Sequence, residues 1–298
     1  MGTDTLTYRV HDGDLTSGTA TVTITVTPPP TLTTVEIAGS NRIETAVLAS
    51  KLAFPKGAET VVVTTGYNWP DALGGSSLAG AANGPILLTA PDSLSGPVAT
   101  EISRLKAKKA YILGSTAAVS AAVETALVKQ LGSGNVVRVG GSNRYETARM
   151  IAAEAVKVLK ASGRTYDGTA FVATGLNFPD ALGASPLAAA KGWPIFLVNP
   201  KGLDAATVSS MKALGVTKVL ILGSGAAVPA AIESGLTRSL GCTTLRLAGD
   251  NRYQTAVAVA SYGVSKAGLG WNKLAITTGI NFPDALAGGV LQAKSGSV

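Results

Sequence analysis

A short phrase built around an asparagine, an arginine and an acid or amide occurs three times in this chain. It reads GSNRIETA, GSNRYETA and GDNRYQTA, at Gly39–Ala46, Gly141–Ala148 and Gly249–Ala256. An asparagine followed three residues later by Glu or Gln is the pattern of a capping box, in which side chains bind free backbone N–H groups at a helix start. The third copy has Gln254 where the others have Glu44 and Glu146. Because glutamine cannot transfer a proton, the pattern favours capping over general acid–base catalysis.

The arginine inside each copy is not required for capping. Arg42, Arg144 and Arg252 fall at the first helical position, where the helix dipole disfavours a cation. We therefore expect each arginine to be held by an anionic partner. That partner is either an external anion or an aspartate of the same module, and the sequence favours the aspartate. The three aspartates are Asp71, Asp180 and Asp284.

A second phrase follows the first in every copy and could form a binding site. It reads TGYNWPDALGG, TGLNFPDALGA and TGINFPDALAG, from Thr65, Thr174 and Thr278. The proline suits the first position of a helix, and the aspartate after it complements the positive helix end. The Thr-Gly pair leaves a strand at its carboxyl end, where open α/β sheets bind ligands. The candidate ligand-binding residues are therefore Asn68, Asp71, Asn177, Asp180, Asn281 and Asp284, together with Arg42, Arg144 and Arg252.

Apolar strands and helices alternate around both phrases. The predicted strands are 35–38, 61–65, 86–89 and 110–113 in the first repeat, 169–174, 195–198 and 219–222 in the second, and 274–278 in the third. The predicted helices of the first repeat are 42–53, 70–82, 97–106 and 121–131. Strands and helices joined by short loops predict right-handed crossovers. The fold class is therefore α/β, with tandem Rossmann-like modules and mostly parallel sheets.

The phrases recur about every hundred residues, which is the size of a small domain. We predict repeats at 34–135, 136–242 and 243–298, the last of which is incomplete because it lacks the second half of the pattern. Residues 1–27 are predicted to form a β-hairpin with one buried face, the remnant of a cadherin-like or immunoglobulin-like sandwich. Residues 28–33 form a proline-rich linker. Within the hairpin, the sequence Asp-Gly-Asp is expected to be a turn rather than a calcium site.

Composition narrows the classes of function. A single cysteine, Cys242, and a single histidine, His11, exclude Cys/His metal sites and argue against a Ser-His-Asp triad. No apolar run approaches the roughly 18 residues of a membrane-spanning helix. Residues 31–298 carry 24 basic and 15 acidic side chains, which favours an anionic partner. Nucleic acid is not predicted, because no dense basic run or basic aromatic strand occurs, and no glycine-rich motif indicates a nucleotide cofactor.

Four motifs follow one another in a fixed order, namely NRYETA, TGxNFPDAL, PILL and ILG. Over residues 34–298 they resemble the type 2 cell wall-binding repeat of Gram-positive bacterial surface proteins. The resemblance implies an exported module that attaches noncovalently to anionic wall polymers, and three modules around a pseudo-threefold axis. It also implies an anchoring role for Pro85, Ile86, Leu87 and Leu88. The second copy departs from this stretch at Phe196, and the third copy lacks it.

The predicted function is noncovalent anchoring of a surface protein to an anionic cell-wall glycopolymer, with no catalytic residues, cofactor or metal. We expect an extracellular location at the cell wall, with export directed by sequence outside this chain. One alternative is a cell-wall hydrolase that uses the recurring aspartates and arginines. A second is a structural or adhesive surface protein that binds other proteins. The incomplete third module is expected to expose apolar surface, which favours strand exchange or self-association.

Overall fold

The computed structural model describes residues 2–27 and 31–298, so part of the predicted linker 28–33 lies outside the described residues. The chain divides into two compact units, Met1–Glu36 and Ile37–Val298. The first unit contains β1 (Gly2–Tyr8) and β2 (Ala20–Val26), which pair antiparallel as predicted. The six threonines of the two strands pair with one another and so share one face.

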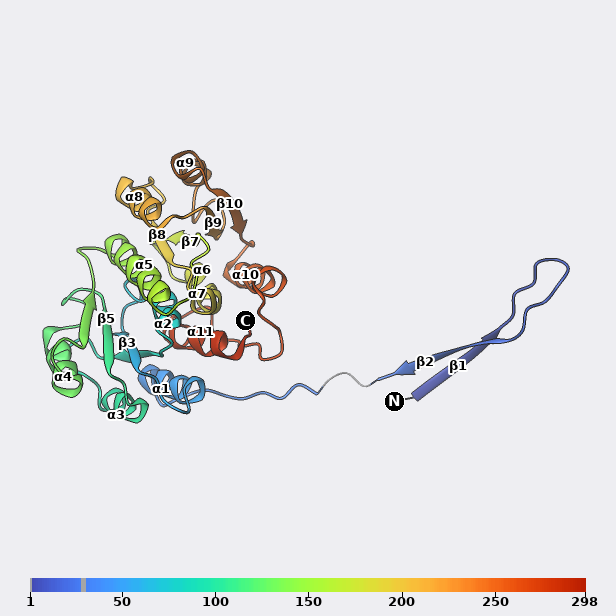
Figure 1. The fold of residues 1–298 in the computed structure, drawn as a ribbon, viewed down its shortest axis with the longest axis horizontal. Coiled ribbons are helices and arrows are strands. Elements are labelled where there is room, and N and C mark those ends of the chain that lie inside the picture. Colours follow the sequence, from blue (N-terminus) through green and yellow to red (C-terminus); the bar gives the residue numbers. More distant parts are fainter. Residues whose placement is uncertain (1, 28–30) are drawn as a thin grey trace. The chain divides into compact units, whose positions relative to one another are not determined.

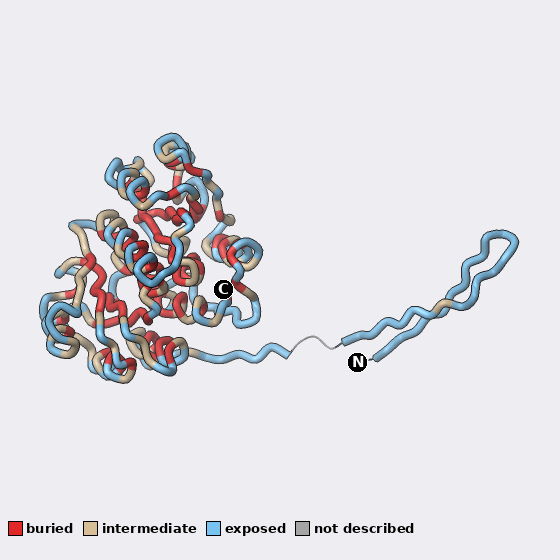
Figure 2. The backbone as a smooth tube through the Cα atoms, viewed as in Figure 1, coloured by how far each residue is buried: buried red, intermediate tan, exposed pale blue. Residues whose placement is uncertain are grey.

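The predicted buried face of this hairpin is not buried. Leu6 and Val22 lie opposite each other in the register, yet their exposed fractions are 49% and 40%. Every described residue of the two strands is exposed except Ala20, as the pale blue tube in Figure 2 shows. Two strands offer no second layer that could cover their apolar side chains. Asp12 forms the expected turn, because its carboxylate accepts hydrogen bonds from the backbone N–H groups of Asp14 and Leu15.

The second unit alternates helices and strands as the sequence predicts. Its elements are α1 (Arg42–Ala53), β3 (Thr60–Thr65), α2 (Gly75–Ala81), β4 (Ile86–Thr89), α3 (Gly96–Leu105), β5 (Lys109–Leu113), α4 (Ala121–Leu131), β6 (Val136–Val139), α5 (Arg144–Ala161), β7 (Thr169–Thr174), α6 (Pro179–Gly183), α7 (Ser185–Lys191), β8 (Ile195–Val198), α8 (Ala205–Leu214), β9 (Lys218–Leu222), α9 (Ala230–Leu240), β10 (Thr243–Leu247), α10 (Arg252–Ala267) and α11 (Pro283–Ser295). The helix predicted over 70–82 begins only at Gly75, after a turn over residues 70–74.

Two four-stranded parallel sheets form the core of the second unit. Their strand orders are β4-β3-β5-β6 and β10-β9-β7-β8. The central strands are rich in apolar and β-branched residues and are buried on both faces, so that Val62 lies between Ile86 and Tyr111 with none of its surface exposed. This burial explains why the runs of β-branched residues in the sequence form strands. The first strand of the second repeat, β6, completes the sheet of the first repeat, and β10 likewise completes the sheet of the second.

Two predicted strands are not formed, and the sheet topology explains both. Residues 35–38 and 274–278 have no strand conformation, and Leu274 and Ile276 are 51% and 89% exposed. The counterparts of 274–278, β3 and β7, each lie between two neighbouring strands, and the described residues supply no such neighbours in the third repeat. The counterparts of 35–38, β6 and β10, add to the sheet of the preceding repeat, and the described residues of the third repeat form no sheet that 35–38 could extend. An isolated parallel bridge joins Gly270 and Ser297.

The three repeats close into a ring through their helices. The first helix of each repeat packs on the helices that follow the Pro-Asp motif in another repeat: α5 on α2, α10 on α6, and α1 on α11. At the centre α2, α7 and α11 contact one another, and Figure 1 shows them side by side between the two sheets. The α2–α7 approach is close because Gly80 lies against the backbone of Ala189. The predicted pseudo-threefold arrangement is thus observed in the second unit.

Candidate functional site

Each arginine-containing phrase caps a helix. Asn41 accepts hydrogen bonds from the backbone N–H groups of Ile43 and Glu44, at 2.9 and 3.1 Å, and Asn143 and Asn251 do the same for α5 and α10. The Glu44 carboxylate accepts from both the N–H and the hydroxyl of Ser40. These contacts confirm capping as the role of the asparagine and the acid.

The third repeat changes both members of this side-chain pair. Asp250 stands where the other copies have serine, and Gln254 stands where they have glutamate. Gln254 Oε1 still accepts from the Asp250 backbone N–H at 2.8 Å. An aspartate cannot donate to a carboxylate as a serine hydroxyl does, and two carboxylates would repel each other, so the neutral glutamine fits the altered neighbour.

The arginines bind backbone carbonyl groups and not the aspartates of their own modules. Nη1 of Arg42, Arg144 and Arg252 donates to the carbonyl oxygens of Gly66, Gly175 and Gly279, at 2.7, 2.7 and 2.6 Å. These glycines are the second residues of the three Thr-Gly pairs. Among the described residues, no ion pair joins the three arginines to a carboxylate. The expected internal ion pair is therefore wrong. Each arginine ties the start of its helix to the Thr-Gly pair, which follows a central strand in the first two repeats.

Two of the recurring aspartates reach across a boundary between repeats. The Asp71 carboxylate lies beside the Thr147 hydroxyl of the second repeat and near the charge of Arg144. Its carboxylate also lies beside Gly114, whose φ of +100° is a conformation that favours glycine. Burial raises the pKa of Asp71, and the nearby Thr147 hydroxyl and Arg144 charge only partly oppose that effect.

The next boundary repeats this arrangement. Asp180 lies beside Thr255 and near Arg252, and it faces Gly223, whose φ is +93°. Burial again raises the pKa of the aspartate. Each of these two junctions thus brings an aspartate of one repeat together with a threonine and an arginine of the next.

The aromatic residues before the prolines pack at the centre of the ring. Ring centroids of Trp69 and Phe178 are 6.2 Å apart, and those of Phe178 and Phe282 are 6.0 Å apart. The guanidinium of Arg144 lies 4.9 Å from the Trp69 ring, and that of Arg252 lies 5.9 Å from Phe178. These contacts make the three aromatic rings packing residues at the centre of the ring.

The third position of the ring differs from the other two. Asp284 is exposed, and Arg42 lies over Tyr67 of its own repeat at 5.2 Å. The Thr45 hydroxyl donates to the backbone oxygen of Asn41 and has no aspartate partner among its described contacts. The structure thus brings together the motif residues at two junctions and leaves those of the third apart.

A pocket of about 170 Å³ opens at the second junction, between the second and third repeats. Its lining includes Asn177, Asp180, Ser224, Asp250 and Arg252. This volume is below the roughly 300–1,000 Å³ of a site that encloses a small molecule, so the pocket could hold only part of a ligand. Two carboxylates and one guanidinium line it, together with amide and hydroxyl groups, which makes it a site of hydrogen-bonding groups without excess positive charge.

The Pro-Ile-Leu-Leu stretch lies away from these junction residues. Ile86, Leu87 and Leu88 form the edge strand β4 with at most 2% of their surface exposed, and Pro85 before them is buried. Their side chains belong to the core and cannot touch a polymer in this conformation.

Sequence reasoning missed the threonines and glycines of the two junctions. Thr147 and Thr255 lie inside the repeated phrase itself, and Gly114 and Gly223 lie in a repeated Ile-Leu-Gly-Ser sequence that ends the β5 and β9 strands. The recurrence of these residues marks them as candidates, but the spacing of the repeats does not show that residues of one repeat contact those of the next.

Most of the chain resembles known proteins in sequence. The family model for cell wall binding domain 2 (CWB2) matches residues 36–124, 138–233 and 246–298. The chain is 32% identical over 258 residues to the N-acetylmuramoyl-L-alanine amidase LytC of Bacillus subtilis, covering 87% of this chain and 48% of the amidase. It is also 32% identical over 264 residues to the Bacillus subtilis amidase enhancer, covering 89% of this chain and 34% of that protein.

Two solved structures share the fold. Cwp8 from Clostridium difficile is 32% identical with a TM-score of 0.74, over 88% of this chain and 43% of Cwp8. Cwp6 from the same organism is 24% identical with a TM-score of 0.75, over 88% of this chain and 40% of Cwp6. The chain therefore spans half or less of the length of the relatives it matches. The family match begins at residue 36, so the sandwich origin of the hairpin stays a prediction.

Proposed function

The chain belongs to the cell wall binding domain 2 family, and from this premise we propose that it anchors a surface protein noncovalently to an anionic cell-wall glycopolymer. A location at the cell wall or cell surface follows from the family. The observation that carries the proposal is the family match, which recurs in all three repeats of the ring. The excess of 24 basic over 15 acidic residues in 31–298 supports an anionic partner.

Repetition gives this function a physical advantage. When one weak contact forms, the other modules of the same ring are held near the polymer at a high effective concentration. The junctions around Asp71 and Asp180 fix the modules relative to one another, so that less orientational freedom is lost on binding. The chain can therefore bind the polymer tightly even though each module contributes little binding free energy.

For the motif residues of the junctions, we propose contact with hydroxyl groups of the polymer's sugar units. The second-junction pocket offers carboxylate, amide and hydroxyl groups, which exchange hydrogen bonds with sugar hydroxyls. The first junction has the equivalent residues Asn68, Asp71 and Arg144. The exposed Asn281 and Asp284 would contribute at the third position without a closed junction.

We further propose that these modules do not catalyse a reaction. Most polar residues of the repeated phrases already have a structural role: Asn41, Asn143 and Asn251 cap helices, the arginines bind carbonyl groups, and Asp71 and Asp180 lie at the junctions between repeats. Cys242 is buried, and its burial raises the pKa of the thiol, which disfavours a nucleophilic thiolate. Among the described residues, no helix is long and apolar enough to cross a bilayer.

Sedimentation with isolated walls tests the proposal. The full chain is mixed with Bacillus subtilis walls, either intact or stripped of their anionic polymers, and the bound fraction is measured together with release of soluble wall fragments. We expect binding to intact walls, loss of binding to stripped walls, and no release of fragments. Equal binding to both preparations would contradict a polymer anchor, and release of fragments by the purified chain would favour the hydrolase alternative.

A further inference from the structure

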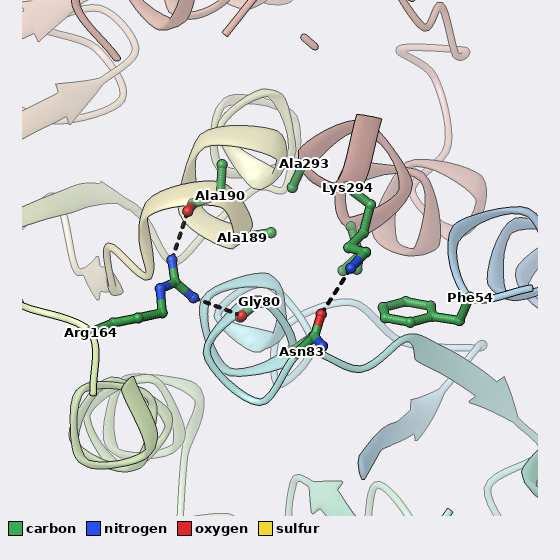
Figure 3. Close-up of a pocket in the computed structure, with 10 residues that line it drawn as sticks. Phe54, Gly80, Asn83, Arg164, Ala189, Ala190, Ala293 and Lys294 are labelled. Atoms are coloured by element: carbon green, nitrogen blue, oxygen red, sulfur yellow. Dashed lines mark hydrogen bonds between the residues drawn. The ribbon is translucent and has the colours of Figure 1, made fainter. Parts of the chain in front are cut away.

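The ring has two chemically different ends. In each βαβ unit the helix runs antiparallel to the strands, so helix C-terminal ends and strand N-terminal ends lie on one side. The modules share this direction, because Trp69, Phe178 and Phe282, which precede the central helices, meet one another. The opposite ends of α2, α7 and α11 line a common pocket of about 140 Å³ (Figure 3). We call the side of the helix C-terminal ends the basal face and the side of the repeated phrases the motif face.

Positive charge is concentrated on the basal face. Nine helices of the described chain carry Lys or Arg in their last turn. By their places in the fold, seventeen basic residues belong to this face: Lys51, Lys56, Arg104, Lys106, Lys108, Lys109, Lys129, Lys157, Lys160, Arg164, Lys191, Lys212, Lys218, Arg238, Lys266, Lys273 and Lys294. Only four acidic residues accompany them: Glu59, Glu101, Glu154 and Asp167. The excess is therefore thirteen positive charges.

The motif face has the reverse balance. Its seven basic residues are Arg42, Arg138, Arg144, Arg149, Lys201, Arg246 and Arg252. Its ten acidic residues are Glu44, Asp71, Asp92, Glu124, Glu146, Asp180, Asp204, Glu233, Asp250 and Asp284. The net positive charge of the second unit thus arises on the basal face alone.

Helix stability does not account for this distribution. Basic residues favour helix C-terminal ends because each end carries about half an elementary negative charge. The ten helix ends of this face would offset about five charges by that measure, well below the excess of thirteen, because α6 continues directly into α7 and ends inside the fold. Lys56, Lys108 and Lys218 also lie outside helices, at or before the starts of strands. Ion pairs of the described chain involve few residues of this face, namely Lys108–Glu59, Arg104–Glu101 and Lys157–Glu154.

The pocket at the centre of the basal face shows how cations are held there. Arg164 donates to the carbonyl oxygens of Gly80 and Ala190, at 3.1 and 2.8 Å, and so spans two repeats. Lys294 of the third repeat donates to Asn83 Oδ1 at 3.0 Å. Figure 3 shows both side chains beside the ends of the central helices. All three repeats therefore contribute to one basic surface around the ring axis.

We propose that the basal face, opposite the repeated phrases, binds the anionic groups of the wall polymer. This inference rests on the proposed anchoring function and assigns its electrostatic contact to a surface. A polymer with regularly spaced negative groups matches a face whose exposed lysines are distributed over all three repeats, since many such charges attract it together. The motif face, with its acidic excess, contacts only the uncharged hydroxyl groups.

Two variants with equal net charge test the assignment. The basal variant replaces four exposed lysines without a carboxylate partner in the described chain, Lys51→Gln, Lys56→Gln, Lys160→Gln and Lys266→Gln. The control variant adds four acidic residues to the motif face at exposed first-turn positions of α4 and α9, Ala121→Glu, Ala122→Glu, Ala230→Glu and Ala231→Glu. Acidic residues suit helix N-terminal ends, so the control should keep its fold.

Binding to Bacillus subtilis walls is measured for both variants and the parent chain, with circular dichroism to verify folding. We expect the dissociation constant of the basal variant to rise about tenfold or more, and that of the control to change less than about twofold, because charges beyond a Debye length are screened. A larger loss in the control variant than in the basal variant would overturn the assignment while leaving the anchoring function intact. Failure of the parent chain to bind intact walls would overturn both.

Discussion

The contact between α2 and α7 at Gly80 offers a sharp test of the ring. A methyl group added at Gly80 would overlap the carbonyl oxygen of Ala189 and approach its carbonyl carbon and Cα. All three are backbone atoms, which cannot rotate away as a side chain could, so Gly80→Ala must push the two helices apart. Overpacking of this kind costs about 1–3 kcal/mol. Alanine regains about 1 kcal/mol through its better helix propensity, so the expected net loss is up to about 2 kcal/mol.

Gly288→Ala is the matched control. Gly288 lies within α11, and a methyl group there would meet nothing within 4 Å. Only the helix-propensity term applies, so this variant should gain up to about 1 kcal/mol. Urea unfolding followed by circular dichroism measures both changes. In a thermal scan about 1 kcal/mol corresponds to roughly 2–4 °C for a domain of this size. If Gly80→Ala were as stabilising as Gly288→Ala, the close α2–α7 approach, and with it the ring, would be refuted.

Three further predictions concern the junction, the caps and the third repeat. Because burial raises the pKa of Asp71, the ionised carboxylate destabilises the folded state, so Asp71→Asn should have a free energy of unfolding equal to or above that of the parent at pH 7. Urea unfolding at several pH values should show this advantage shrinking as the pH falls through the folded-state pKa of Asp71. Asn41→Ala should cost about 1 kcal/mol of unfolding free energy through the lost N-cap, whereas Glu44→Gln should change it little. Backbone amides of 274–278 should exchange hydrogen faster than those of 61–65, which form a buried central strand; equal protection would contradict the unpaired conformation.

Local sequence signals predicted most of the second unit. The runs Val61–Thr65 and Thr169–Thr174 consist of apolar residues and threonine, and both form central strands within one residue of the predicted bounds. The caps were equally accessible, because an asparagine three residues before an acid or amide acts on its own helix.

The features that the sequence did not predict depend on contacts between residues far apart in the chain. Residues 274–278 resemble the two central strands, yet a strand forms only where neighbours pair with it, and pairing depends on segments distant in the chain. The hairpin has the alternation of a half-buried sheet, but alternation does not supply the layer that covers it. The arginines illustrate the same limit at the site, since a local rule predicted an anionic partner and the fold supplied a backbone carbonyl.

The charged residues are visible in the sequence, but their division between two faces becomes clear only from the sheet topology. A net charge of +7 says nothing about where the charge resides. Once every helix is known to run antiparallel to its strands, lysines at helix ends and strand starts fall on one face, and the acidic residues of helix starts fall on the other. The repeated phrases can be found because they recur, whereas most basic residues of the basal face vary in position from one repeat to the next.

The ionic-strength dependence of wall binding tests the central claim most directly. The dissociation constant of the full chain for Bacillus subtilis walls would be measured from low salt to about 1 M, where the Debye length falls to about 3 Å. Attachment to an anionic polymer through many lysines predicts that binding weakens steeply and continuously over this range. Binding that stays unchanged at high salt would contradict an electrostatic anchor.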